Sequence, residues 1–200
     1  MIISYKVLRS NTTNMTNINK NKMIVEALGG VFIFIYVFSF SILAHASEIT
    51  PENIVQVINL ERQANGIAPL AVNNQLQTAA RNKSVDMIVH NYFDHYAFGK
   101  TPWSFILAEN YNYQVAGENL AMGFRTSEGV VNAWMNSPTH RANILNSEFQ
   151  EIGVGVVKGA YTEDGQTGET TMTTEITAAP KSKVSQLLDK VISTISNIFK

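Results

Sequence analysis

The spacing of apolar residues changes late in this chain, and that change limits the folds open to it. From Pro51 to Leu145 the apolar residues recur mostly at helical spacing, apart from an extended piece at 117–122, whereas Ile152, Val154 and Val156 alternate with small residues. Alternation of this kind is typical of a strand, and the β-branched run 170–177 predicts a second strand across a turn-rich connection. Helices first and a hairpin late predict an α+β fold and not a parallel βαβ sheet. The predicted helices cover about 51–65, 74–90, 101–107, 127–135 and 138–145.

The N-terminal segment predicts export. Residues 28–43 are uncharged and mostly apolar, basic residues precede them, and the small-residue pattern Ala44-His45-Ala46 follows. That order is typical of a secretory signal peptide. We predict a signal peptide at 1–46, with a low-complexity basic region at 1–22, an apolar core at 28–43 and cleavage before Ser47. An uncleaved membrane anchor is the alternative, and either places the rest of the chain outside the cell or at its surface.

Composition excludes several classes of function. The chain has no cysteine, which excludes disulfides, thiolate metal sites and a cysteine nucleophile. Residues 47–180 carry seven basic and fourteen acidic side chains, a net charge of −7. Nucleic-acid binding depends on clustered Lys and Arg, so no nucleic-acid partner is expected. The motifs of serine hydrolases, nucleotide-binding proteins and zinc peptidases are missing as well.

A small polar set remains for chemistry. His95 follows Tyr92-Phe93-Asp94, His140 follows Ser137-Pro138-Thr139, and Glu118 interrupts an apolar stretch. Two imidazoles and a carboxylate are plausible ligands of a divalent cation such as zinc. Their spacing alone does not distinguish this from the alternatives, in which the histidines are ordinary core or surface residues and Glu118 caps a helix or pairs with Arg141.

Five segments taken together resemble a known family. The segments 60–70, 92–95 (Tyr-Phe-Asp-His), 117–120 (Gly-Glu-Asn-Leu), 134–145 and 151–156 occur in the order found in the bacterial branch of the CAP superfamily. This superfamily of cysteine-rich secretory proteins, antigen five and pathogenesis-related proteins is also named after its SCP domain. The resemblance covers about residues 52–177. It implies an α-β-α sandwich with a small three-stranded antiparallel sheet, at about 116–122, 151–158 and 169–177, between helical layers.

The resemblance also implies a site and a function. His95, Glu118 and His140 match family residues that hold a divalent cation in a cleft, so we expect zinc or another divalent cation and no organic cofactor. Asn119, Ser137 and Arg141 are expected to support them, and Ser137 stands where eukaryotic members carry an acidic residue. The expected function is a binding module for a lipid or sterol, a cell-wall component or a surface protein. The alternative is a metal-assisted, peptidase-like hydrolase that uses His95, Glu118 and His140.

The C-terminal segment 181–200 lies beyond the family resemblance. After Pro180, apolar residues recur at intervals of three and four while Ser, Lys, Gln and Asn fill the other positions. This pattern predicts an amphipathic helix. Three surfaces remain open for its apolar side: the chain's own CAP/SCP domain (47–180), another copy of the chain, or an anionic membrane, which its net charge of +3 favours.

Overall fold

A computed structural model of the chain describes residues 48–198. The predicted signal peptide at 1–46 lies outside the described residues. Of the helices at 48–198, none is both long enough and apolar enough to cross a membrane. The fold is α+β, as predicted, and its elements follow in the order α2 Pro51–Ala64, β1 Ala71–Val72, α3 Asn74–Val89, α4 Pro102–Ala108, β2 Tyr113–Met122, α5 Ser127–Met135, α6 Pro138–Ile144, β3 Glu151–Glu163, β4 Gln166–Pro180 and α7 Lys183–Ile198.

Capping residues set where the helices begin. The side chains of Thr50, Asn73, Thr101 and Thr126 each accept a hydrogen bond from a backbone N–H in the first turn of α2, α3, α4 and α5. These bonds satisfy donors that a helix cannot satisfy internally. Proline occupies the first turn of α2, α4 and α6, where its fixed φ suits the helix and its missing N–H costs nothing.

The sheet has four strands in the order β1-β3-β4-β2. β3, β4 and β2 pair antiparallel, which confirms the predicted core of the sheet. β1 adds a fourth strand that the sequence analysis missed, and it pairs parallel with β3 through only Ala71 and Val72. Two residues are too few to show a period-two pattern. β4 also extends three residues beyond the predicted range at each end.

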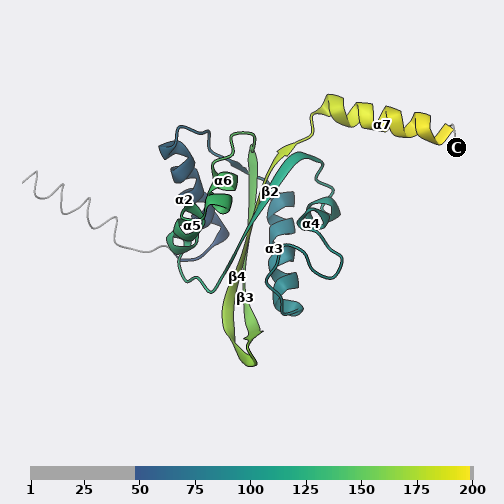
Figure 1. The fold of residues 1–200 in the computed structure, drawn as a ribbon. Helices are drawn as coiled ribbons and strands as arrows, with labels where there is room; N and C mark the ends of the chain where they lie inside the picture. The colour runs from purple at the N-terminus through teal and green to yellow at the C-terminus, as the bar shows by residue number, and fades with distance from the viewer. Residues whose placement is uncertain (1–47, 199–200) are drawn as a thin grey trace, which may run out of the picture. The chain divides into compact units, whose positions relative to one another are not determined.

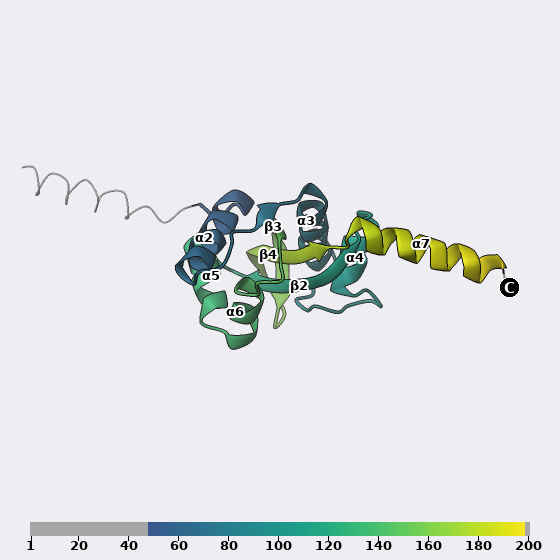
Figure 2. The same cartoon turned by 90° about the horizontal axis from the view of Figure 1, so that it is seen from above.

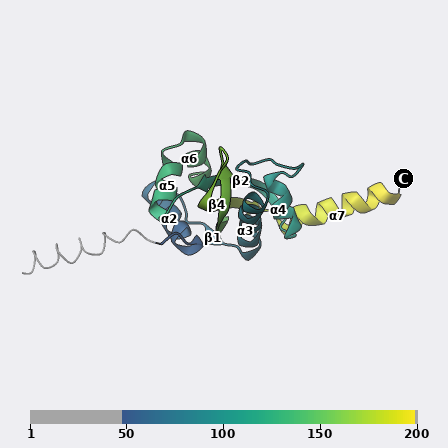
Figure 3. The same ribbon diagram turned by 90° about the horizontal axis from the view of Figure 1, so that it is seen from below.

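Helices cover both faces of the sheet. Figures 1 and 2 show α3 and α4 on one side and α2, α5 and α6 on the other, and Figure 3 shows the same layers from below. The larger apolar core lies on the α2/α5/α6 side and includes Ile54, Ile58 and Trp134. Trp134 is a core residue, and its Nε1 donates to the carbonyl of Leu120 at 2.9 Å.

Two glycines set the distance between α3 and the sheet. A Cβ on Gly153 would lie 2.1 Å from the backbone of Leu76, and one on Gly155 would lie 2.3 Å from the backbone nitrogen of Arg81. Both approaches are far closer than carbon atoms tolerate. The backbone of α3 therefore packs directly on β3, and α3 carries several residues of the site described below.

Gly117 has a different role from the one its sequence context suggests. A tight turn before a strand would explain a glycine there, yet Gly117 lies inside β2, which already begins at Tyr113. A Cβ at this position would come within 2.9 Å of the ring of Phe149 and 3.1 Å of the side-chain oxygen of Asn143. Gly117 therefore makes room for these two side chains next to Glu118.

Candidate functional site

His95 and Glu118, two of the three predicted ligands, form a hydrogen-bonded ion pair. The Nδ1 atom of His95 lies 2.6 Å from Oε1 of Glu118. Glu118 is buried on β2, whereas the imidazole of His95, on the loop after α3, is 43% exposed. The hydrogen bond that His95 donates to the Glu118 carboxylate raises the pKa of His95, and burial opposes it only in part. The imidazolium form is therefore favoured, as expected beside a carboxylate.

Lys83 holds the loop that presents His95. This lysine is buried on α3, and its Nζ donates to the carbonyl oxygens of Asp94 at 2.7 Å and His95 at 3.1 Å, and to the hydroxyl of Tyr92 at 3.3 Å. Burial lowers the pKa of Lys83, while Glu118 and nearby aspartates act in the opposite direction. The sequence analysis did not assign this role to Lys83. The available signal was a lysine among the core-facing residues of a predicted helix, where charge is rare without partners.

Asp86, one turn further along α3, forms hydrogen bonds with a residue at each end of the same loop, Tyr92 and Lys100. Its Oδ2 accepts from the Tyr92 hydroxyl at 2.7 Å and its Oδ1 from Lys100 Nζ at 2.7 Å. Burial alone would raise the pKa of Asp86, but the hydrogen bonds from Lys100 and Tyr92 outweigh it and lower that pKa. Lys83 and Asp86 together fix the backbone that carries His95.

His140, the third predicted ligand, lies on α6 and pairs with Ser137. Its Nδ1 lies 2.8 Å from Ser137 Oγ. The Ser137 hydroxyl makes no capping hydrogen bond to the backbone of α6. Its side-chain partner is the imidazole of His140. Burial lowers the pKa of His140, and the charge of nearby His95 lowers it further. The two imidazoles are thus biased toward opposite protonation states.

Asn119 and Asn143 join α6 to β2. Asn119 Nδ2 donates to the carbonyl of His140 at 3.2 Å. Asn143 Nδ2 donates to the Glu118 carbonyl at 3.1 Å and to Asn119 Oδ1 at 2.9 Å. Sequence reasoning missed Asn143, although it lies in the 134–145 segment. Arg141 is exposed, lines a separate pocket with Pro138 and Leu145, and makes no ion pair with Glu118.

The alternation of side chains along β2 explains why Glu118 and Asn119 contact different parts of the structure. Neighbouring residues of a strand point to opposite faces, so Glu118 faces the α3/α4 side and meets His95. Asn119 faces the other side and meets α6. Within 48–198 no three His, Asp or Glu side chains lie close enough together to hold one metal ion in this structure. The donors fit a divalent cation in kind, and the buried Oε2 of Glu118 has no hydrogen-bond partner.

A second buried carboxyl, Glu175 on β4, lies across from Asn119. It is fully buried, and neither oxygen makes a hydrogen bond of good geometry, although Asn119 and Thr177 lie next to it. Burial, with Glu118 adding to it, raises the pKa of Glu175 to about 8. Glu175 is therefore neutral near pH 7, and the sequence analysis gave it no role.

Two pockets adjoin the paired residues. One, of about 340 Å³, is lined by His95, Glu118, Trp103 and Asn143 among others. The other, of about 300 Å³, is mostly apolar and has a polar end formed by Ser137 and His140. Its apolar lining consists of Phe93, Leu120, Ala121, Met122, Phe124, Ala133 and Trp134.

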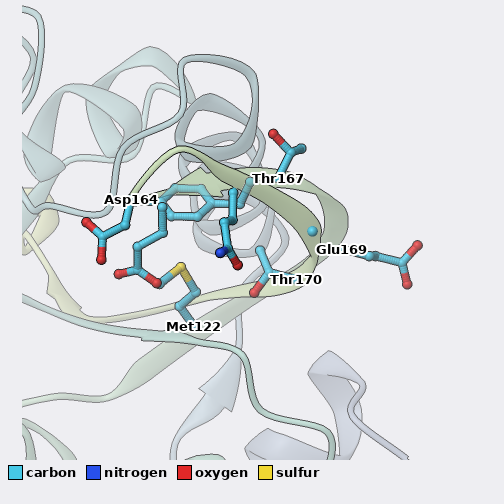
Figure 4. A pocket seen from close by; sticks show the side chains of 9 residues that line it. Met122, Asp164, Thr167, Glu169 and Thr170 are labelled. Atoms are coloured by element: carbon cyan, nitrogen blue, oxygen red, sulfur yellow. The ribbon is translucent and has the colours of Figure 1, made fainter.

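A further pocket, of about 480 Å³, lies along the β3–β4 hairpin and contains none of the predicted site residues. Figure 4 shows its Asp164 and Glu169 at opposite ends of the view, with Met122 and Thr170 between them. The acidic side chains are too dispersed to form a cation site: the described residues hold no metal-binding group of three.

Comparison with known proteins assigns the chain to a family. The family model described as the cysteine-rich secretory protein family (CAP) matches residues 55–174. The protein YkwD of Bacillus subtilis is 46% identical over 109 residues, which is 54% of this chain and 42% of that protein. The membrane protein YlbC of the same organism is 32% identical over 114 residues, 56% of this chain and 33% of YlbC. This chain therefore spans less than half the length of either relative.

Solved structures agree with the fold. An extracellular protein of Bacillus anthracis that contains an SCP domain superimposes with a TM-score of 0.56 at 27% identity, over 64% of this chain and 40% of that one. An outer surface protein of Borrelia burgdorferi gives a TM-score of 0.56 at 22% identity, over 68% of this chain and 100% of that one. The second likeness shows the fold alone.

Proposed function

Because the chain belongs to the cysteine-rich secretory protein (CAP) family, we propose that it is an exported binding module and not an enzyme. The predicted leader supports export. One structural relative, the extracellular protein of Bacillus anthracis, points the same way. The chain would then act outside the cell or at the cell surface.

The observation that carries this proposal is the pairing of Glu118 with His95. In a metal-assisted hydrolase Glu118 would be the general base, and a base must reach the proton of the attacking water. Here its Oε1 is 2.6 Å from His95 Nδ1 and its carboxylate is buried. A carboxylate engaged in this way holds the loop and is a poor general base.

The apolar pocket beside His140 is the proposed ligand site. Aromatic and aliphatic side chains line most of it, and the Ser137–His140 pair supplies polar atoms at one end. This distribution favours an apolar chain with a polar head, because polar groups at one end can fix the orientation of an otherwise apolar ligand. Of the three ligand classes that the resemblance implies, a lipid or sterol fits best, ahead of a cell-wall component or a surface protein.

A divalent cation is proposed as a second ligand of the same region. His95, Glu118 and His140 would have to move closer together to hold it, with the unpartnered Glu118 Oε2 as the first oxygen available. A bound cation would supply positive charge and Lewis acidity. The chain itself would have to release the proton that His95 shares with Glu118, so binding would compete with the ion pair.

A pocket-filling substitution tests the lipid site. Ala133→Phe places a ring in the pocket beside His140, whereas Ala142→Phe makes the same change in the separate pocket lined by Pro138 and Arg141. With a fluorescent fatty acid as the probe, we expect binding by the wild type and by Ala142→Phe, and at least a roughly tenfold loss in Ala133→Phe. Equal affinities in all three proteins, or no binding by the wild type, would contradict the proposed site.

The hydrolase alternative has its own test. The wild type and Glu118→Gln are incubated with zinc and with ester, peptide and glycan substrates. The proposal expects no turnover by either protein. Turnover that Glu118→Gln abolishes would replace the binding module with an enzyme.

A further inference from the structure

The C-terminal helix α7 exposes a continuous apolar face. Its aliphatic side chains with described surroundings are Val184, Leu187, Leu188, Val191, Ile192 and Ile195, and each is between 49% and 67% exposed. Exposure of this extent shows that they are not packed against the rest of the described chain. The chain's own domain, one of the three surfaces left open by the sequence, does not cover this face in the structure.

The polar and apolar residues of α7 are cleanly separated around the helix. At 3.6 residues per turn, the six aliphatic positions fall within an arc of roughly 140°. The remaining positions of Lys183–Ile195 are Lys, Ser, Gln, Asp and Thr, and they fall outside that arc. A broad apolar arc opposite a polar one is the pattern of a helix that lies on a surface.

The charges on α7 indicate the kind of surface. Residues 181–200 carry four lysines and one aspartate, a net charge of +3. Lys183 and Lys190 are exposed, and on the helical wheel they lie next to the edge of the apolar arc at Leu187. In that position their aliphatic stems can lie along apolar material while the ammonium groups reach anionic headgroups.

A second copy of the helix fits these residues less well. Paired helices bury a narrow seam and usually place charged residues beside it. In α7 the apolar arc is broader than such a seam because Leu187 and Ile192 extend it on both sides. Two copies would also bring lysines of like charge together. A membrane-spanning role is not available either, because α7 is not long and apolar enough to cross a bilayer.

We propose that α7 lies in the interface of an anionic lipid bilayer, with its aliphatic face in the acyl region and Lys183 and Lys190 at the headgroups. α7 begins three residues after β4 ends at Pro180, and the backbone N–H of Lys181 donates to the carbonyl of Asn112 at 2.9 Å. A short connection fixed to the sheet in this way keeps the CAP fold close to the lipid surface. This contact is independent of any ligand in the pocket beside His140.

The test is co-sedimentation with vesicles, using residues 46–200, which form one compact unit. Vesicles of phosphatidylcholine mixed equally with phosphatidylglycerol are compared with pure phosphatidylcholine, at low and at high salt. We expect binding to the anionic vesicles, little binding to the neutral ones, and weaker binding at high salt because ions screen the lysines. Circular dichroism should show no loss of helix on binding.

Three double variants locate the contact. Leu188→Gln with Ile192→Gln disrupts the apolar face and should abolish binding. Ser196→Gln with Asn197→Gln, the matched control on the polar arc, should bind like the wild type. Lys183→Gln with Lys190→Gln should weaken binding to anionic vesicles by roughly tenfold or more, given about 1 kcal/mol per lysine at such a surface. The thermal transition of the domain, followed by Trp fluorescence, should be unchanged in all three.

Several results would overturn the proposal. One is a wild type that binds neither kind of vesicle, and another is a wild type that binds both equally at all salt concentrations. A third is a concentration-dependent increase in mass without lipid that Leu188→Gln with Ile192→Gln abolishes, which would assign the apolar face to a second copy of the chain. Loss of vesicle binding in Ala133→Phe, with α7 intact, would assign lipid contact to the pocket instead.

Discussion

Arg62 and Glu175 are both fully buried in the core, yet they form no ion pair. Arg62 donates to four backbone carbonyls, those of Ala68, Ile144, Asn146 and Phe149. Its guanidinium thus satisfies the loops around α6 and leaves Glu175 without a hydrogen-bonded partner. Burial raises the pKa of Glu175 and so favours the neutral acid, although the charge of Arg62 acts in the opposite direction, because a buried charge without a direct partner is far more costly than a buried acid.

Glu175→Gln is expected to change how stability depends on pH. Glu175 has a pKa of about 8 in the folded protein, above its ordinary value of 4.5. Between these values the folded state holds one more proton than the unfolded state, so the free energy of unfolding falls as pH rises, by about 1.4 kcal/mol per pH unit from this group. Gln carries no titrating proton, so the variant should gain stability over the wild type from pH 4.5 to 8. Urea unfolding at several pH values measures this, and parallel curves would show that Glu175 is not protonated.

Replacing the Glu118 carboxylate with an amide should reverse the direction in which the pKa of His95 is shifted. The Glu118 hydrogen bond raises the pKa of His95 above 6.5, whereas burial and Lys83 act to lower it. In Glu118→Gln both effects of Glu118 are lost and only the smaller effect of Asp94 still raises the pKa of His95, so burial and Lys83 should bring that pKa below 6.5. The same pair gives the wild type a stability that is complete below pH 6.5 and is lost as pH rises through the raised pKa. Histidine ring resonances in NMR titrations report the pKa, and urea unfolding at several pH values reports the stability. An unchanged pKa of His95 in the variant would mean that the pair does not form in solution.

Lys83→Met should loosen the loop that carries His95. Met has a similar length but cannot donate to the carbonyls of Asp94 and His95, and we expect a loss of about 1–3 kcal/mol in the free energy of unfolding. Hydrogen exchange should increase at residues 92–98 more than elsewhere. Lys158→Met, an exposed lysine on β3, is the control and should change neither quantity.

Cation binding should depend on His140 and on pH. Zinc must displace protons from its ligands, so its affinity should rise with pH over the range in which His95 loses its proton. His140→Ala should weaken binding by roughly tenfold or more, whereas His90→Ala, outside the donor set, should not. Ser137→Glu, which introduces the acidic residue that the family resemblance implies for this position, should strengthen it. Calorimetry measures each value, and equal binding by wild type and His140→Ala would remove His140 from the site.

Gly155→Ala should be strongly destabilising. The new methyl group would lie about 2.3 Å from the backbone of α3, so the helix would have to move away from the sheet. We expect a loss of about 1–3 kcal/mol or more in the free energy of unfolding. Gly168→Ala is the matched control: it lies on the neighbouring strand, and its Cβ would meet nothing within 4 Å. A comparable loss in both variants would argue against close packing as the cause.

The parts of the fold that the sequence predicted are those specified locally. Capping residues and apolar periodicity located α2 and α3, and alternation located β3, because each signal lies within one element. β1 was not predicted because its two residues pair with a strand eighty positions away in the sequence.

Only part of the site was predicted, because the roles of the other residues depend on contacts between distant parts of the sequence. His95, Glu118 and His140 were recognised through the family resemblance, and the structure pairs His95 with Glu118 but places His140 against Ser137. Lys83, Asp86 and Asn143 were missed because their roles depend on partners that only the folded chain brings near. Strand alternation also separates Glu118 from Asn119, although the two are neighbours in sequence.

The contact of α3 with Gly153 and Gly155 has a consequence for how this protein can change. At Gly153 and Gly155 the helix that carries Lys83 and Asp86 rests on bare backbone, so these two positions accept no larger side chain unless the helix moves. Substitutions in the core beneath α2 and α5 leave that spacing untouched. The loop around His95 can therefore keep one geometry while the core on the opposite side of the sheet is free to diverge.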